Sequence, residues 1–408
     1  MKLRTLAVAL AAFALAPASA EADAVTDWNG HAVASLVGAA GQSPTVSTIH
    51  LAMVHGAVYD AVNSIDRRYE PYRVGIRASR SDSQDAAAAT AAYRTLVALV
   101  PAQQGSLAAL YDASLAAIPA GEAKQAGIEV GEIAAAAMLA ARSGDGRGGP
   151  FRFPVPIVPG PGQWRPVPPS LGNDPGAWVK DVRPFLVRDA GRYGTPGPYP
   201  MKSKAYARDY DEVKKVGALQ SKSRTADQTD QARFWAEGPQ PWTRAARALA
   251  IKHRLKRVES ARMFAMLYMT AADAAIATWK DKARWLFWRP YSAIREAAAD
   301  GNPSTVADPN WEPLIPTPPY PDHPSGLSSL GAAFAESLES VFGRRVRFSM
   351  NSVSSGTVRH YRGFSEAVDE IVDARVYSGI HFRKPDVDGA ALGRRIARDG
   401  LARHFGRG

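Results

Sequence analysis

The chain has 408 residues, and its 50 lysines and arginines against 39 aspartates and glutamates give a formal net charge of +11. It contains no cysteine, which excludes disulfide bonds, thiolate metal ligands and cysteine nucleophiles. A basic balance attracts anions, but the sequence has neither a dense Lys/Arg block nor the basic stripe interleaved with aromatic residues that is typical of nucleic-acid binding. We therefore expect no nucleic-acid partner and favour a small anion as the ligand.

Residues 1–20 have the anatomy of a secretory signal peptide. Two basic residues precede an apolar run over residues 6–15, and a series of small residues ends at Ala20. The run is shorter than the ~20 apolar residues that a membrane anchor needs, and no later segment offers an uncharged run of that length. We therefore predict an exported protein, periplasmic or secreted, without integral membrane association, in which residues 21–408 form a single all-helical domain.

Apolar periodicity predicts helices in the first part of the chain. One helix is expected over residues 44–63, and two or three alanine-rich helices over residues 83–143. The composition then changes to proline, glycine and arginine over residues 144–200. So long an irregular stretch inside a compact domain is typical of a functional covering loop.

Helices are predicted again in the second half of the chain. Their expected ranges are residues 203–218, 225–237, 242–256, 258–284, 326–342, 364–377 and 387–404. A turn-rich stretch at residues 302–325 and a short hairpin within residues 345–362 separate some of them. Because the sequence shows too little strand-like alternation for a sheet protein, the pattern predicts an all-α fold.

Two cations lie near the end of the apolar helix predicted at residues 258–284. Lys282 and Arg289 are seven residues apart, so they share a face if the helix continues. That face continues the apolar stripe of the helix. Burying two cations on such a stripe costs free energy unless an anion neutralises them. Alternatively, both side chains extend to the surface among neighbouring aromatic residues.

The segment Pro-Ser-Gly at residues 324–326 opens the next predicted helix. Ser325 is a suitable N-cap, and Gly326 allows a ligand to approach the backbone closely. Free N–H groups at a helix start can bind an oxyanion. The alternative is an ordinary Pro/Ser helix cap.

A third cation, Arg375, ends an apolar stripe on the helix predicted at residues 364–377. His381 follows six residues later, which on a straight helix would place it on a different face. A helix that ends at Gly379 would let the chain turn and point His381 back toward Arg375. The three segments together therefore predict a buried cationic pocket for a tetrahedral oxyanion, vanadate or phosphate.

Lys-x6-Arg-Pro, Pro-Ser-Gly and Arg-x5-His together resemble the signature of the vanadium-dependent haloperoxidases and their relatives, the type 2 phosphatidic acid phosphatases and class A bacterial acid phosphatases. Further stretches are similar to bacterial haloperoxidase-like proteins: residues 52–63, 224–229, 272–277, 287–295 and 379–383. The resemblance extends over most of the chain. It implies a helical bundle of the haloperoxidase and acid phosphatase type, with residues 144–200 as a covering loop.

The resemblance also implies roles for the site residues. Three cations would neutralise the oxyanion, and a hydroxyl and a backbone N–H would bond its equatorial oxygens: Lys282, Arg289 and Arg375, with Ser325 and Gly326. His381 would bind the metal of vanadate through a ring nitrogen, or attack phosphorus in a phosphatase. The implied activity is vanadate-dependent oxidation of halide by hydrogen peroxide, with halide or a small organic acceptor as partner.

The sequence departs from the family pattern at Leu327, where the acid–base histidine of Pro-Ser-Gly-His is expected. His323 lies four residues earlier and can substitute only if its loop folds inward. Two alternative functions therefore stay open. One is a secreted acid phosphatase with a phosphohistidine intermediate at His381, and the other is a non-catalytic protein that binds vanadate or phosphate.

A second departure follows the ligand histidine. The family's acidic residue four positions after His381 is replaced by Pro385. Because metal-binding histidines usually need a partner that orients the ring, we expect Asp386 or Asp388 to take this part.

Overall fold

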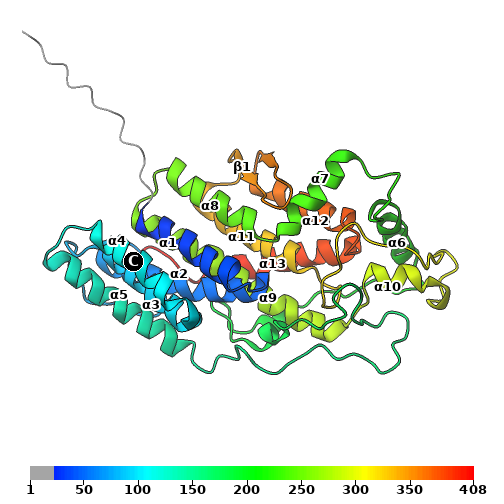
Figure 1. Cartoon of the computed structure of the whole chain (residues 1–408), viewed down its shortest axis with the longest axis horizontal. Helices are drawn as coiled ribbons and strands as arrows, with labels where there is room; N and C mark the ends of the chain where they lie inside the picture. The colour runs from blue at the N-terminus through cyan, green and yellow to red at the C-terminus, as the bar shows by residue number, and fades with distance from the viewer. Residues whose placement is uncertain (1–22) are drawn as a thin grey trace, which may run out of the picture.

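The computed structural model describes residues 23–408, so the predicted signal peptide at residues 1–20 lies outside the described residues. Within the described part, thirteen α-helices and one two-stranded sheet build the molecule, which confirms the predicted all-α class (Figure 1). Over the same residues, no helix is both long enough and apolar enough to cross a bilayer.

Five α-helices precede the long loop. They are α1 (Ala24–Val33), α2 (Pro44–Asp66), α3 (Gln84–Leu99), α4 (Gln104–Ala116) and α5 (Glu122–Ala141), with a π-helical turn at Ala34–Ala39 and a 3-10 turn at Pro101–Gln103. Residues 83–143 thus hold three helices, as expected. Small residues let two of them pack closely, since a Cβ on Gly131 of α5 would lie 2.6 Å from the Ala87 carbonyl oxygen of α3.

Eight α-helices and the sheet follow the long loop. They are α6 (Lys204–Val216), α7 (Ala226–Phe234), α8 (Gln240–Lys252), α9 (Arg257–Trp285), α10 (Pro290–Arg295), α11 (Gly326–Phe342), α12 (Phe364–Tyr377) and α13 (Arg383–Leu401), with β1 (Phe348–Asn351) antiparallel to β2 (Val358–Tyr361). Short 3-10 turns lie at Ala177–Asp181, Ala190–Tyr193, Trp235–Glu237 and Ala297–Ala299. The buried helix α9 packs against α2, α11 and α13, and α3–α5 lie at the opposite end of the molecule from α6 and α10 (Figure 1).

The end of α9 settles a condition that the sequence left open. Helix α9 stops at Trp285, Leu286 takes a left-handed conformation with φ 46°, and Arg289 becomes the N-cap of α10. Pro290 explains the break, because proline disfavours helical geometry in the residue before it and suits the first position of a new helix. The helix does not continue to Arg289, so the condition under which Lys282 and Arg289 would share one helix face is not met.

The long loop at residues 144–200 has two short 3-10 turns and is bound along α9. The Asp273 carboxylate accepts hydrogen bonds from the backbone N–H groups of residues 185–187, at 2.6, 2.8 and 2.9 Å. Asp281 accepts a further bond from the Thr195 N–H at 2.7 Å. Two buried carboxylates of α9 thus hold the loop against the helix that carries Lys282.

Candidate active site

The predicted site residues come from five places in the chain and meet in the interior. Lys282 lies in the last turn of α9, Arg289 caps α10, and Ser325 with Gly326 begins α11. Arg375 lies in the last turn of α12, and His381 lies in the turn between α12 and α13. Gly379 in that turn has φ 76°. Because glycine adopts this left-handed conformation freely, the chain reverses there, as predicted, and directs His381 inward.

Tyr320 brings two of the cations together. The ring centre of Tyr320 lies 5.0 Å from Lys282 Nζ and 4.9 Å from the Arg289 guanidinium carbon. Lys282 Nζ also donates to the carbonyl oxygens of Pro321 and Asp322, at 2.6 and 3.0 Å. The turn before α11 thus surrounds both cations, and neither side chain extends to the surface, since Lys282 is 0% exposed and Arg289 1%.

His381 is oriented by Asp322, a residue that the sequence analysis did not single out. Asp322 Oδ1 lies 2.6 Å from His381 Nδ1 and 3.5 Å from the nearest Arg289 nitrogen. The same Arg289 nitrogen lies 3.0 Å from His381 Nε2. A carboxylate at Nδ1 holds the proton there and leaves the lone pair of Nε2 to face the cations.

This geometry corrects the expectation for Asp386 and Asp388, because neither of them contacts His381. The Asp386 side chain contacts the start of α11, where its Oδ1 accepts from Ser328 Oγ at 2.9 Å. Asp388 pairs with Lys384 Nζ at 2.9 Å, and its Oδ2 lies 3.6 Å from His323 Nε2. Both residues fall within α13, whereas Asp322 precedes α11 in a turn that lies against the histidine.

His323 is fully buried and belongs to a separate polar cluster. Its Nε2 lies 2.7 Å from Thr195 Oγ1, and that hydroxyl donates to the Asp281 carboxylate. Since the threonine proton is engaged, His323 must donate from Nε2, which leaves Nδ1 as a bare acceptor without a hydrogen-bond partner among the described residues. Burial lowers the pKa of His323 to about 3, with Lys282 adding to the effect, so the ring is neutral.

Burial also dominates the protonation of the site. It lowers the pKa of Lys282 well below its usual value, and Arg289 nearby lowers it further. Burial raises the pKa of Asp322 to about 8, against the opposing effect of Arg289 and Lys282, and that of Asp386 to about 7. Burial therefore opposes the ionised form of both carboxyl groups, so they offset less of the charge of the three cations than exposed carboxylates would.

Several strong donors in the pocket still lack partners. Arg289 Nη2 and Arg375 Nε are buried without a hydrogen-bond partner among the described residues. The Ser325 side chain forms no cap hydrogen bond to α11, although its Oγ accepts from Ser328 Oγ at 3.2 Å. The Gly326 N–H lies among the first backbone donors of the helix, which have no partner within it. Unsatisfied buried donors are rare in native structures, and a tetrahedral oxyanion supplies the acceptors that these groups lack.

Gly326 and Leu327 lie side by side at the start of α11 and line the same cavity. A Cβ on Gly326 would lie 2.9 Å from the Trp279 ring, so this position needs glycine. Half-buried Leu327 lines a cavity of about 230 Å³ together with Gly326 and Arg375. Leucine has no proton to exchange, so this wall of the cavity provides no acid–base group.

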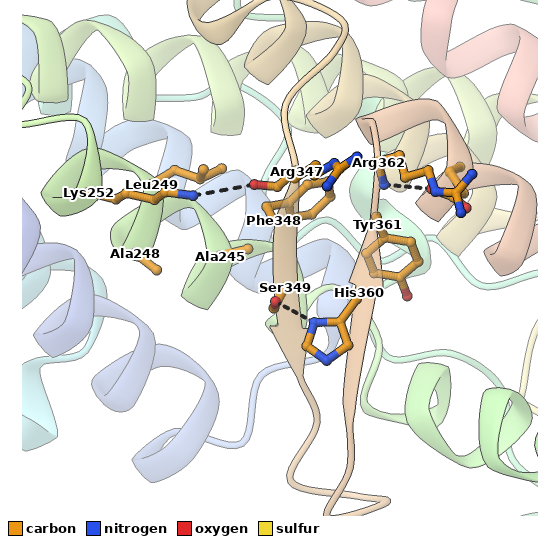
Figure 2. Close-up of a pocket in the computed structure, with 11 residues that line it drawn as sticks. Ala245, Ala248, Leu249, Lys252, Arg347, Phe348, Ser349, His360, Tyr361 and Arg362 are labelled. Atoms are coloured by element: carbon orange, nitrogen blue, oxygen red, sulfur yellow. Dashed lines mark hydrogen bonds between the residues drawn. The ribbon is translucent and has the colours of Figure 1, made fainter.

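A second cavity, of about 690 Å³, lies between α8 and the β1–β2 hairpin (Figure 2). Exposed cations Lys252, Arg347 and Arg362 line it together with exposed His360. It contains none of the residues that the sequence singled out, and its cations are solvated. The described residues also include no cluster of three or more His, Cys, Asp or Glu side chains suited to a metal cation.

The fold and the site define a helical-bundle protein with a buried, cation-lined pocket that has one oriented histidine. Comparison with known proteins shows which proteins this chain is similar to. Residues 262–405 match the family described as the VCPO second helical-bundle domain. The vanadium chloroperoxidase of Curvularia inaequalis is 28% identical over 223 residues, and the match covers 44% of this chain and 36% of that enzyme. The chain thus spans about a third of the length of this curated relative.

Two solved structures share most of the fold. A bacterial vanadium-dependent iodoperoxidase superposes with a TM-score of 0.79 at 22% identity, covering 94% of this chain and 96% of that one. The holo form of a bacterial vanadium-dependent chloroperoxidase gives a TM-score of 0.73 at 18% identity, covering 89% and 94%. The resemblance to the vanadium-dependent haloperoxidases is confirmed, and the chain is related to them and has their helical fold.

Proposed function

We propose that this protein catalyses the oxidation of halide by hydrogen peroxide with vanadate bound in the pocket. The observation that carries the proposal is the juxtaposition of buried, incompletely satisfied cations with the Nε2 of His381. Lys282, Arg289 and Arg375 supply the charge, while Asp322 fixes the ring. The relation to vanadium haloperoxidases supports the same activity.

The residues of the pocket fit vanadate. The three cations would neutralise its oxygens, Ser325 Oγ and the Gly326 N–H would donate to it, and His381 Nε2 would supply the nitrogen ligand. If vanadate is bound there, it would supply Lewis-acid activation of hydrogen peroxide. The protein keeps water away from this chemistry, because Ser325 and His381 are 0% and 1% exposed.

Proton transfer needs a group other than Leu327. His323 has a neutral ring with a bare Nδ1, and Lys282 releases its proton more readily than an exposed lysine because burial lowers its pKa. We propose that Lys282 polarises hydrogen peroxide in the pocket. The Nδ1 of His323 offers a hydrogen-bond acceptor there, but a pKa lowered to about 3 makes the ring too weak a base to take up the proton. The export predicted from residues 1–20 would place the enzyme in the periplasm or outside the cell.

One experiment tests the proposal and its alternatives together. Halide oxidation and phosphomonoester hydrolysis are measured side by side on the purified protein, with and without added vanadate, and on His381→Ala as the control. We expect vanadate-dependent halide oxidation that His381→Ala abolishes. Hydrolysis inhibited by vanadate would indicate a phosphatase, and the absence of both activities would indicate a non-catalytic oxyanion-binding protein.

A further inference from the structure

The cavity of about 690 Å³ between α8 and the β1–β2 hairpin, which we call the hairpin cavity, lies outside the proposed active site (Figure 2). Its α8 side consists of small and aliphatic side chains, namely Ala245, Ala248 and Leu249. Its lining also includes a single carboxylate, Glu366, and three exposed cations, Lys252, Arg347 and Arg362. The lining therefore has an excess of positive charge, and a concave surface concentrates the resulting field.

Two of these cations lie at the same end of the hairpin. Phe348 pairs with Tyr361 in the ladder. Arg347 and Arg362 adjoin that pair, one on each strand. Like charges at facing positions of two strands are destabilising, and the carboxylate of Glu366 is engaged with the Arg362 backbone N–H at 2.6 Å. An anion in the hairpin cavity would offset this repulsion.

The edge of β1 that faces α8 offers main-chain groups as well. Lys252 Nζ donates to the Arg347 carbonyl oxygen at 3.5 Å, and Arg244 Nη2 donates to the Asn351 carbonyl oxygen at 2.7 Å. Both donors belong to α8, so both carbonyls point toward that helix. Because the main-chain groups of every second residue in a strand point to the same edge, the N–H and C=O of Ser349 lie on this edge between them. Ser349 is exposed and lines the hairpin cavity, so an extended chain there can pair with it.

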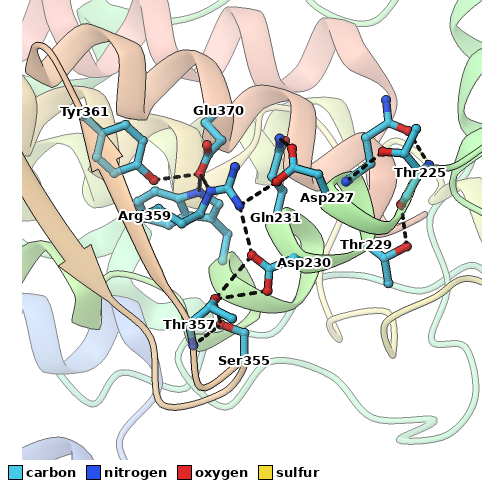
Figure 3. A network of polar contacts seen from close by, with 12 residues as sticks. Thr225, Asp227, Thr229, Asp230, Gln231, Ser355, Thr357, Arg359, Tyr361 and Glu370 are labelled. Carbon is cyan, nitrogen blue, oxygen red and sulfur yellow. Dashed lines mark hydrogen bonds and ion pairs between the residues drawn. The ribbon is translucent and has the colours of Figure 1, made fainter.

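A polar network holds the hairpin in place from the other side. Arg359 of β2 pairs with Asp227 and Asp230 of α7, at 3.0 and 2.9 Å, and with Glu370 of α12 at 2.8 Å (Figure 3). Tyr361 donates to the same Glu370 at 2.7 Å. The hairpin is thus fixed before any ligand binds, and a preorganised surface lowers the entropic cost of binding.

We propose that the hairpin cavity binds an extended acidic peptide, a segment of a partner protein in which every second side chain is a carboxylate. Such a segment would add to the edge of β1 and use the main-chain groups of Ser349, as peptides do when they extend a sheet. Successive side chains of a strand point to opposite faces, so alternate carboxylates would face the cations together. This surface lies apart from the proposed active site, and the inference does not depend on the proposed function.

Other anionic partners use less of what the hairpin cavity offers. A lipid headgroup or a free phosphate forms no hydrogen bonds of the kind that a strand edge provides. Nucleic-acid bases stack on accessible aromatic rings, whereas Phe348 and Tyr361 are only 7% and 4% exposed. The open strand edge thus favours a peptide.

The test is calorimetric titration of the intact protein with an acetylated and amidated peptide, Glu-Thr-Glu-Thr-Glu. We expect saturable binding that sodium chloride weakens, because salt screens exposed charges. The rearranged peptide Thr-Glu-Glu-Glu-Thr has the same charge without the alternation and should bind more weakly. A fully N-methylated Glu-Thr-Glu-Thr-Glu keeps the carboxylates but has no backbone donors, and it should bind more weakly as well.

Two kinds of variant locate the binding. The double substitution Arg347→Gln and Arg362→Gln should weaken binding roughly tenfold, since each exposed ion pair contributes up to about 1 kcal/mol. Its matched control is Arg77→Gln with Arg80→Gln, two exposed cations that do not line the hairpin cavity.

Ala248→Trp narrows the hairpin cavity without changing its charge and should also weaken binding. Ala136→Trp, at an exposed position of α5, is its control. Thermal melting shows that each variant is folded, and the charge and size variants do not depend on each other.

The absence of binding at millimolar peptide would overturn the proposal, as would equal losses in the variants and their controls. Equal affinity for the rearranged or the N-methylated peptide would show that net charge alone is recognised. Tighter binding of inorganic polyphosphate or of a short oligonucleotide of equal charge would replace the peptide with a different class of polyanion.

Discussion

At the scale of single residues, the pairing of Asp322 with His381 distinguishes this pocket. The acidic residue expected after the histidine is displaced by Pro385, and a carboxylate from the turn before α11 lies at Nδ1 instead. The functional requirement, a hydrogen-bond acceptor that fixes one tautomer, is thus met from a different segment. Asp322 lies three residues before Ser325, and a charged residue between prolines in a turn was the one signal in the sequence that pointed to it.

Asp322→Asn tests this pairing. The amide is the same size, but it can either donate or accept at Nδ1, so it no longer fixes the histidine tautomer. We expect vanadate affinity to fall on the order of 10- to 100-fold, as is usual for such partners of metal-binding histidines. Equilibrium titration with vanadate measures the effect, and Asp388→Asn is the control because Asp388 does not contact His381. Equal losses in the two variants would contradict the role of Asp322.

Leu327→His tests the missing acid–base group. A histidine at this position would face the cavity beside Arg375, where it could protonate the leaving oxygen of a phosphate ester. We expect hydrolysis of an unactivated alkyl phosphate to rise on the order of 100-fold or more, which is typical of positioned acid–base catalysis. An activated aryl phosphate needs little protonation and should respond weakly. An equal response from both esters would show that residue 327 is not at the proton-donor position.

At the scale of elements, α9 carries the site and also binds the long loop. Asp273 and Asp281 hold residues 185–187 and Thr195, and Lys282 follows Asp281 directly in the sequence. The composition of the loop predicted that it covers the site. The loop is attached by two carboxylates of α9, a helix that the sequence predicts to be apolar. Asp273 is a charged residue within the largely apolar α9. Its hydrogen bonds to the loop explain why a carboxylate lies at this position.

Asp273→Asn should loosen the loop. The carboxylate accepts from three backbone N–H groups, and an amide leaves at least one of them without an acceptor. Each unsatisfied group costs about 1–3 kcal/mol, so we expect a lower free energy of unfolding and faster tryptic cleavage within residues 144–200. Asp181→Asn is the control, since that half-exposed side chain of the same loop pairs only with Lys180. Cleavage at the unaltered rate would contradict the structural role of Asp273.

At the scale of the whole molecule, the pocket couples ligand binding to stability. The buried donors that lack partners among the described residues gain acceptors when an anion is bound. Ligand binding to the folded state at 100 times the dissociation constant stabilises by about 2.7 kcal/mol. We expect orthovanadate to raise the melting temperature by a few degrees and sodium chloride at equal ionic strength to leave it unchanged. The absence of a shift at millimolar vanadate would contradict the oxyanion pocket.

His55 in α2 provides a test of stability against pH that is independent of the site. Burial lowers its pKa to about 3, so it stays neutral in the folded protein, whereas the unfolded chain takes up a proton below about pH 6.5. The folded pKa is the lower one, so stability falls as the pH drops from 6.5 toward 4, by about 1.4 kcal/mol per pH unit for one proton. His55→Gln should remove this part of the slope. Buried carboxyls such as Asp60 act in the opposite direction in both proteins and cancel in the difference.

The sequence by itself determined the helical class, most helix ranges and the set of cations with His381. Helix periodicity, proline breaks and buried charge are local properties, so they can be read along the chain. The tertiary structure alone decided which carboxylate orients His381 and that Arg289 begins a new helix. It also decided that His323 faces Thr195 and that the residues around Leu327 enclose a cavity. These depend on where turns bring distant segments together, and the direction of a turn follows from packing across the whole core.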